Sequence, residues 1–279
     1  MLIKIVVDST ADLPHEIYKE YDITVVPVLA QFGSETLRDD VDFSRDEFYR
    51  RLVEEPEPPK TSAPTPGMYE HWFRALTEAG HEVLSISLAG NLSGTFNAAR
   101  QAASLIENGR VHCVDGMNVS IPLGFLTLKA AQAVRDGATI EEAAALVEQR
   151  RDRGVLLVAF ETLRYLEKGG RIGRMRALLG TVLSVKPIME VKLGEVLPVE
   201  QVRTWKRVPP RMVELAQARG AYEELAALYT TERATAEQMA DQLAAAGLMP
   251  RERILIQQAG GVLGAHAGPG AVGIGGLLK

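Results

Sequence analysis

Hydrophobic residues in the first part of the chain occur in short aliphatic runs separated by segments with helical spacing. The run at residues 3–7 has the length and composition of a strand buried on both faces, and further strand-like runs lie at 82–88, 110–115 and 155–160. A further run at 23–29 is interrupted by Pro27, which places that strand near a sheet edge or a bulge. Strands that alternate with helices predict a parallel sheet covered by helices on both faces.

The pattern changes after about residue 160. Helical spacing is found at residues 162–168, 175–185, 209–219 and 235–246, and strand-like runs at 186–190, 196–204, 225–230 and 254–257. The turn at 192–195 joins two of these strands as a hairpin. We therefore expect an α/β protein of two domains, an N-terminal parallel-sheet α/β domain at 1–160 and a C-terminal α+β domain at 161–279. The ligand site is expected between them.

Composition and charge restrict the class of partner. The net charge of -5 argues against a nucleic-acid partner, which requires a concentrated basic surface. The basic cluster at 168–176 is local, so its expected target is a small anion or a phosphate. A single cysteine, Cys113, fits a reducing compartment. Neither a signal peptide nor an apolar run of about 20 residues is present, so we expect a cytoplasmic protein.

Three polar turns carry the candidate chemistry. The turn at 92–96 contains Ser93 and Thr95 between a strand and a helix, where unpaired backbone N–H groups favour a small anion. Taken alone, a serine or threonine here is more often a helix cap. The other turns are 60–62 and the glycine-rich segment 264–270, which contains His266.

Two kinds of chemistry fit these turns poorly. A serine hydrolase would use Ser93 as nucleophile, His266 as base and Asp8 as the group that orients the histidine, but the Gly-x-Ser-x-Gly elbow is missing. Nucleotide binding lacks both of its glycine-rich signatures, and the five histidines show no paired metal-ligand spacing. A cofactor or metal is therefore not expected.

Capture of a carboxylate by neutral donors fits better. Hydroxyls, backbone amides and one imidazole satisfy an anion without burying an unpaired charge in the empty site. If the remainder of the cleft is aliphatic, the ligand is a fatty acid. The residue pattern alone does not select an acyl chain.

Five motifs, in their order and spacing, resemble the DegV family over the whole chain. They are residues 8–14 (DSTADLP), 60–66 (KTSAPTP), 92–95 (LSGT), 167–172 (EKGGRI) and 264–270 (GAHAGPG). The resemblance implies a two-domain α/β protein that holds one long-chain, palmitate-like fatty acid. It also implies a bacterial binding subunit without catalysis of its own. Such a subunit presents the carboxyl group to a separate ATP-dependent fatty acid kinase, which forms acyl phosphate for phospholipid synthesis.

The resemblance also assigns residues. The carboxylate would be bound by a set of polar groups at the turns, namely Thr61, Ser62, Ser93, Gly94, Thr95 and His266. Arg171 and Arg203 would face the acyl phosphate or the kinase. The chain departs from the family at 116–118, where a glycine-rich helix start is usual, and at Pro122. This leaves chain length and saturation open, and a regulatory lipid-sensing role or the hydrolase remains the alternative.

Overall fold

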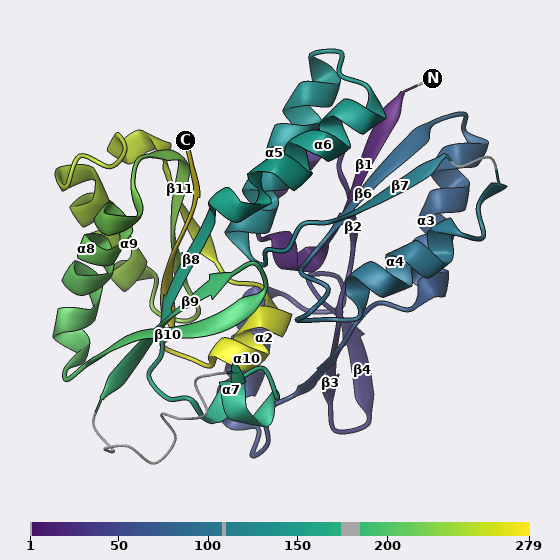
Figure 1. Cartoon of the computed structure of the whole chain (residues 1–279). Coiled ribbons are helices and arrows are strands. Elements are labelled where there is room, and N and C mark those ends of the chain that lie inside the picture. Colours follow the sequence, from purple (N-terminus) through teal and green to yellow (C-terminus); the bar gives the residue numbers. More distant parts are fainter. Residues whose placement is uncertain (1, 108–109, 174–184) are drawn as a thin grey trace.

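The computed structural model describes residues 2–107, 110–173 and 185–279. Three sheets organise the chain (Figure 1). The first is a four-stranded parallel sheet in the order β2 (Thr24–Val26), β1 (Ile3–Asp8), β6 (Glu82–Ser87) and β7 (Val111–Asp115). This sheet confirms the parallel architecture predicted from the aliphatic runs.

Helices cover both faces of the parallel sheet. Side chains of Val6 and Val83 face α3 (Pro66–Glu78) and α4 (Thr95–Ala103). The alternate positions, including Val7 and Leu84, face α5 (Ile121–Arg135) and α6 (Ile140–Arg150). Alternation along each strand therefore buries the sheet on both sides, as the continuous apolar runs require.

The second sheet is mixed and has six strands. Its order is β10 (Glu195–Val202), β9 (Lys186–Lys192), β8 (Gly154–Ala159), β13 (Val272–Leu278), β11 (Tyr222–Tyr229) and β12 (Ile254–Gln258). One face packs on α8 (Val208–Arg219) and α9 (Arg233–Ala245). The other face meets α5, which lies between the two large sheets (Figure 1).

Smaller elements complete the chain. A three-stranded sheet contains β4 (Glu35–Arg38), β3 (Leu29–Phe32) and β5 (Lys60–Ser62). The remaining α-helices of the described residues are α1 (His15–Glu20), α2 (Arg45–Glu54), α7 (Arg164–Lys168) and α10 (Gly261–Ala267). Helix α10 packs against α2 and α7, close to β3 and β5.

Three expectations about elements need correction. The predicted strand 23–29 is two strands, β2 and β3, which belong to different sheets and are separated at Pro27. The strand at 155–160 was expected in the parallel sheet, but β8 lies in the six-stranded sheet, antiparallel to both neighbours. A buried aliphatic run specifies a strand and does not specify which sheet it joins.

The third correction concerns the glycine-rich end of the chain. Helix α10 and the interior strand β13 were both missed, because five glycines in these two elements remove the hydrophobic pattern. The predicted helix at 175–185 lies almost entirely outside the described residues. The division into domains at residues 160 and 161 stays a prediction.

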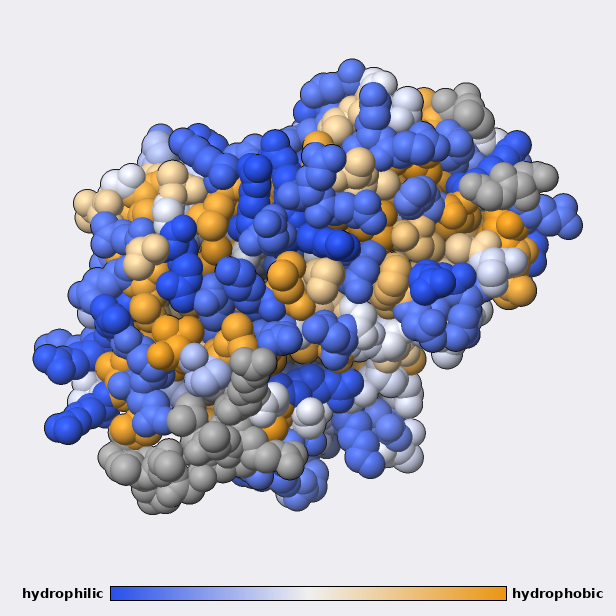
Figure 2. All heavy atoms as spheres, viewed as in Figure 1, coloured by the Kyte–Doolittle hydropathy of each residue, from blue (hydrophilic) through white to orange (hydrophobic). Residues whose placement is uncertain are grey.

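Within the described residues, no helix is both long and apolar enough to cross a bilayer. Outside the grey atoms, the face shown in Figure 2 carries hydrophobic residues in small groups among hydrophilic ones.

Candidate functional site

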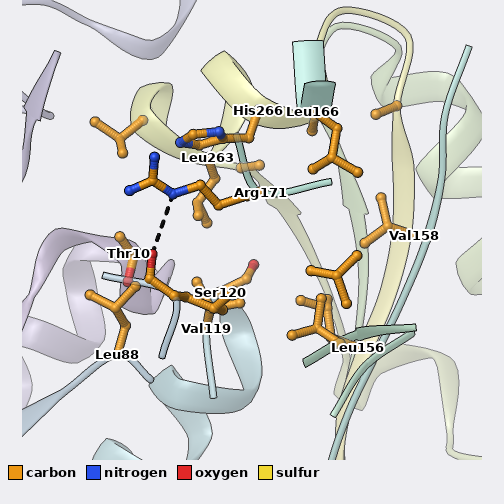
Figure 3. A pocket seen from close by; sticks show the side chains of 18 of the residues that line it. Thr10, Leu88, Val119, Ser120, Leu156, Val158, Leu166, Arg171, Leu263 and His266 are labelled. Carbon is orange, nitrogen blue, oxygen red and sulfur yellow. Dashed lines mark hydrogen bonds between the residues drawn. The ribbon is translucent and has the colours of Figure 1, made fainter. Parts of the chain in front are cut away.

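A pocket lies where the two large sheets, β5 and α10 come together. The cavity has a volume of about 150 Å³. Polar and apolar residues line different parts of it, as Figure 3 shows for Arg171 and His266 on one side and Leu156 and Val158 on another.

The apolar wall is formed by one face of the six-stranded sheet. Pairing across the sheet places Met189, Val158 and Leu228 in one row, with Gly273 between the last two. The next row carries further aliphatic side chains, and those that line the pocket are Leu156, Val191 and Val196. The period of two along each strand explains why alternate residues of β8 line the pocket while Leu157 packs under α8 and α9.

Glycines in β13 leave room on this face. A Cβ atom at Gly275 would lie 2.2 Å from Cγ2 of Ile121, so α5 can approach the sheet only because the side chain is missing. At Gly273 the added atom would lie 3.3 Å from Leu228. The pocket therefore continues over β13 between larger side chains.

The polar wall brings together three of the predicted turns. Thr61 lies on β5, Ser93 in the loop before α4, and His266 on α10, and all three line the pocket. Oγ1 of Thr61 is 2.9 Å from Nε2 of His266. Ser62 also lines the pocket, but it belongs to the exposed side of β5.

Local hydrogen bonds fix the turn around Ser93. Its Oγ accepts from the backbone N–H of Thr95 at 3.3 Å and lies 2.8 Å from Oγ1 of Thr95. The first helical residue of α4 is Thr95, and Gly94 is the cap residue with no side chain to satisfy the helix. Ser93 thus satisfies an N–H at the helix start, and its hydroxyl still borders the pocket. Thr95 is fully buried and Gly94 is exposed, and neither lines the pocket.

His266 is held as a neutral ring. Burial, and then the cation of Arg171, lower its pKa to about 4. Its Nδ1 is buried without a hydrogen-bond partner. Gly169 packs on this atom so closely that an added Cβ would lie 2.1 Å from it, which explains a glycine directly after α7.

The two predicted arginines lie in different places. Arg171 lines the pocket, and its guanidinium donates to the carbonyl oxygens of Gly169 at 2.8 Å and Leu92 at 3.4 Å. No ion pair between Arg171 and a carboxylate occurs within residues 2–107, 110–173 and 185–279. Arg203 is exposed after β10 and does not line the pocket.

The hydrolase geometry is not assembled. The carboxylate of Asp8 accepts from Oγ1 of Thr10 at 2.5 Å and from the N–H of Leu88 at 2.8 Å, so it does not orient His266. The histidine is paired with Thr61 and not with Ser93. Asp8 is fully buried, and burial raises its pKa. Its observed role is to join the ends of β1 and β6.

The described residues also contain no cluster of His, Cys, Asp and Glu that could hold a metal ion. Four polar residues that line the pocket were not predicted as part of the site, namely Thr10, Ser120, Tyr229 and Thr230. Thr10 lies in the first motif, which was a signal for it, whereas nothing in the sequence marked Ser120.

A pocket with one polar wall and extensive aliphatic walls is the type of site that accommodates an amphipathic molecule with a single polar head. Comparison with known proteins defines the family. The family model described as "Uncharacterised protein, DegV family" matches residues 2–279, and the chain belongs to the DegV family.

Individual relatives agree in length and fold. A DegV domain-containing protein of Streptomyces coelicolor is 34% identical over 281 residues, covering 98% of this chain and 97% of the relative. The solved structure described as fatty acid binding of a DegV family protein from Thermus thermophilus matches with a TM-score of 0.92 and 30% identity, covering 100% of both chains. A stearic acid-binding protein from Eubacterium ventriosum matches with a TM-score of 0.91 and 25% identity, covering 100% of this chain and 99% of the other.

Proposed function

We propose that this chain binds one long-chain fatty acid, with the carboxyl group at the polar wall and the acyl chain along the six-stranded sheet. The observation that supports this most directly is the arrangement of the pocket, in which Thr61, Ser93 and His266 lie on one wall and aliphatic side chains on another. The Thermus thermophilus and Eubacterium ventriosum proteins of the same fold bind fatty acids.

The pairing of Thr61 with His266 gives the carboxylate its donor. Because Nδ1 of His266 has no partner, a proton on Nε2 avoids a buried, unpaired N–H group. Nε2–H then donates to Oγ1 of Thr61, and the hydroxyl hydrogen of Thr61 remains available to the ligand. The hydroxyl of Ser93 supplies a second donor. Ser62 remains a proposed secondary contact. Gly94 and Thr95 do not line the pocket, and the Thr95 amide donates to Oγ of Ser93, so their proposed part is to hold the Ser93 turn beside the carboxylate.

Magnitudes assign different roles to the two walls. Burial of a sixteen-carbon chain contributes roughly 0.8 kcal/mol per methylene, or about 10 kcal/mol before ordering costs. Each neutral hydrogen bond to the head group contributes about 1 kcal/mol. The aliphatic wall would therefore supply most of the affinity, and the polar wall would set the direction and register of the chain.

We further propose that the protein is a binding subunit that presents the carboxyl group to a separate ATP-dependent kinase, without catalysis of its own. Arg171 supports this part of the proposal, because it lies at the polar wall and is exposed. Within the described residues this guanidinium donates to two carbonyl oxygens and to no carboxylate, and such a group can also contact a phosphoryl group. Arg203 would act in the same partner complex from outside the pocket, and the acyl phosphate would feed phospholipid synthesis.

The direct test is mass spectrometry of the organic extract of freshly purified, denatured protein. The proposal predicts one fatty acid per chain, and the mass would give the chain length and saturation. An empty extract, followed by no uptake of added palmitate or stearate, would contradict the proposal.

A further inference from the structure

The connection between β12 and α10 is held by side chains from the N-terminal part of the chain. The guanidinium of Arg45 donates to the carbonyl of Gln258, and Oη of Tyr49 donates to the carbonyl of Ala259 at 2.9 Å. Both donors lie on α2. The connection leads directly into the helix that carries His266.

Two buried carboxylates hold the next backbone groups. Oδ1 of Asp12 accepts from the N–H of Gly260 at 2.8 Å, and Oδ1 of Asp39 accepts from the N–H of Val262 at 3.3 Å. Asp12 is 0% exposed and Asp39 is 1% exposed, so these bonds are shielded from water. Together, the four hydrogen bonds to backbone groups of residues 258, 259, 260 and 262 fix the start of α10 against the N-terminal part of the chain.

Asp12 also holds the start of α5. Its Oδ2 accepts from Oγ of Ser120 at 2.7 Å. Ser120 has φ of 60° and ψ of -153°, a conformation that side-chain-bearing residues rarely adopt, and it lines the pocket. One carboxylate therefore ties together the first residues of two elements that border the pocket.

Close packing leaves α10 little freedom at this contact. A Cβ atom on Gly260 would lie 3.2 Å from Asp12 and 3.3 Å from Asp39. On Gly264 it would lie 2.5 Å from the ring of Tyr49. The glycines of the last motif thus allow α10 to approach α2 and the two carboxylates.

We propose that Asp12 and Asp39 are positioning residues for the carboxylate site, because they fix α10 where His266 meets Thr61. The inference rests on the proposed function and adds two residues that do not line the pocket. Neither carboxylate contacts the ligand in this proposal. Without them, α10 would shift and Thr61 would lose the partner that directs its hydroxyl hydrogen toward the head group.

The test compares two probes that share an acyl chain and differ in the head group, palmitate and hexadecanol. Both dissociation constants are measured for the wild type, Asp12→Ala, Asp39→Ala and the matched control Asp42→Ala. Asp42 lies in the same loop as Asp39 but forms an ion pair at the surface with Arg38. The assay is run at pH 8, because burial raises the pKa of Asp12 to about 6 and that of Asp39 to about 7.

The proposal predicts that the preference for palmitate over hexadecanol falls about fivefold in each of the first two variants, as expected for one lost hydrogen bond. Thr61→Ala should give a similar loss, and Asp42→Ala should keep the wild-type preference. Asp39→Asn should recover most of the preference, because its amide oxygen can still accept from Val262. The two dissociation constants separate a positioning effect from a loss of stability, because partial unfolding weakens the binding of palmitate and of hexadecanol equally.

The proposal would be overturned if Asp12→Ala and Asp39→Ala bind palmitate and hexadecanol with equally reduced affinity, or if they keep the wild-type preference for palmitate. If the alanine variants do not fold, Tyr49→Phe provides the comparison with little change in volume, because Oη of Tyr49 holds the carbonyl of Ala259 directly before the same helix. Tyr49→Phe removes only the hydrogen bond to Ala259 and should lower the preference to a smaller extent. Failure of the proposed function is distinguishable, because the wild type itself would then bind neither probe or show no preference for palmitate.

Discussion

The two large sheets contribute different chemistry to one pocket. The parallel sheet delivers polar groups through the loops at the carboxyl ends of its strands, including Thr10 and Ser93. The six-stranded sheet delivers an aliphatic surface from the middle of its strands, including Val158 and Met189. Loops can place single donors in chosen directions, whereas a sheet face supplies a wide, regular apolar area.

This difference separates affinity from orientation. A change on the sheet face removes or blocks area that the acyl chain would cover, so it should act strongly on all ligands of that length. A change in a loop removes one donor and should act mainly on head-group preference.

The largest effect is expected from a charge on the aliphatic wall. Val158→Asp would place a carboxylate beside the acyl chain without a partner, so fatty-acid affinity should fall by more than about 100-fold. Leu157→Ala is the matched control, because Leu157 is fully buried on the opposite face of the same strand. It should destabilise the protein by about 2–5 kcal/mol and leave the dissociation constant unchanged. Calorimetric titration and urea unfolding measure the two effects, and equal affinity losses in both variants would argue against a wall at β8.

The next effect concerns His266 and pH. Its folded-state pKa is about 4, so between this value and the ordinary pKa of about 6.5 the unfolded chain binds a proton that the folded chain does not. The free energy of unfolding should therefore fall as pH decreases through this window, by up to about 3 kcal/mol from this residue. Urea unfolding at pH 7 and pH 4.5 should show a smaller pH dependence in His266→Gln. The same slope in both proteins would mean that the ring is not held neutral.

A smaller effect is expected from one loop donor. Ser93→Ala should weaken palmitate binding about fivefold, the value of one hydrogen bond, and weaken hexadecanol binding less. Ser104→Ala is a suitable control, because Ser104 lies at the other end of α4 and its hydroxyl donates only to the carbonyl of Gln101 in the described structure. An unchanged palmitate affinity in Ser93→Ala would remove Ser93 from the site.

The smallest effect on binding is expected at Arg171. Arg171→Ala should change palmitate affinity by less than about twofold, since the proposed donors are hydroxyls. Acyl phosphate formation with the proposed kinase partner, trapped as hydroxamate, should fall about tenfold or more. Arg164→Ala, which removes an exposed guanidinium from neighbouring α7, should preserve turnover. Loss of binding in Arg171→Ala would instead make it part of the carboxylate site.

The sequence predicted the parallel sheet well because buried strands such as β1 and β6 keep their aliphatic composition regardless of context. It failed for β13, where close approach of Ile121 and an open pocket require glycines in place of apolar side chains. The assignment of β8 to the parallel sheet failed because both large sheets bury similar aliphatic residues, so composition does not distinguish between them.

The sequence predicted polar residues of the candidate site and did not predict its aliphatic wall. Thr61, Ser93 and His266 came from motifs, and they do line one pocket. The aliphatic wall could not be predicted, because it depends on pairing between strands that are distant in sequence. The strained conformation of Ser120 and its bond to Asp12 have no local signature either.

The most direct test of the central claim is a crystal structure of the protein with bound palmitate. We predict that the carboxylate lies within hydrogen-bonding distance of the hydroxyls of Thr61 and Ser93, and that the chain runs over Val158 and Met189. A carboxylate located at the aliphatic wall, or a ligand bound outside this pocket, would contradict the account.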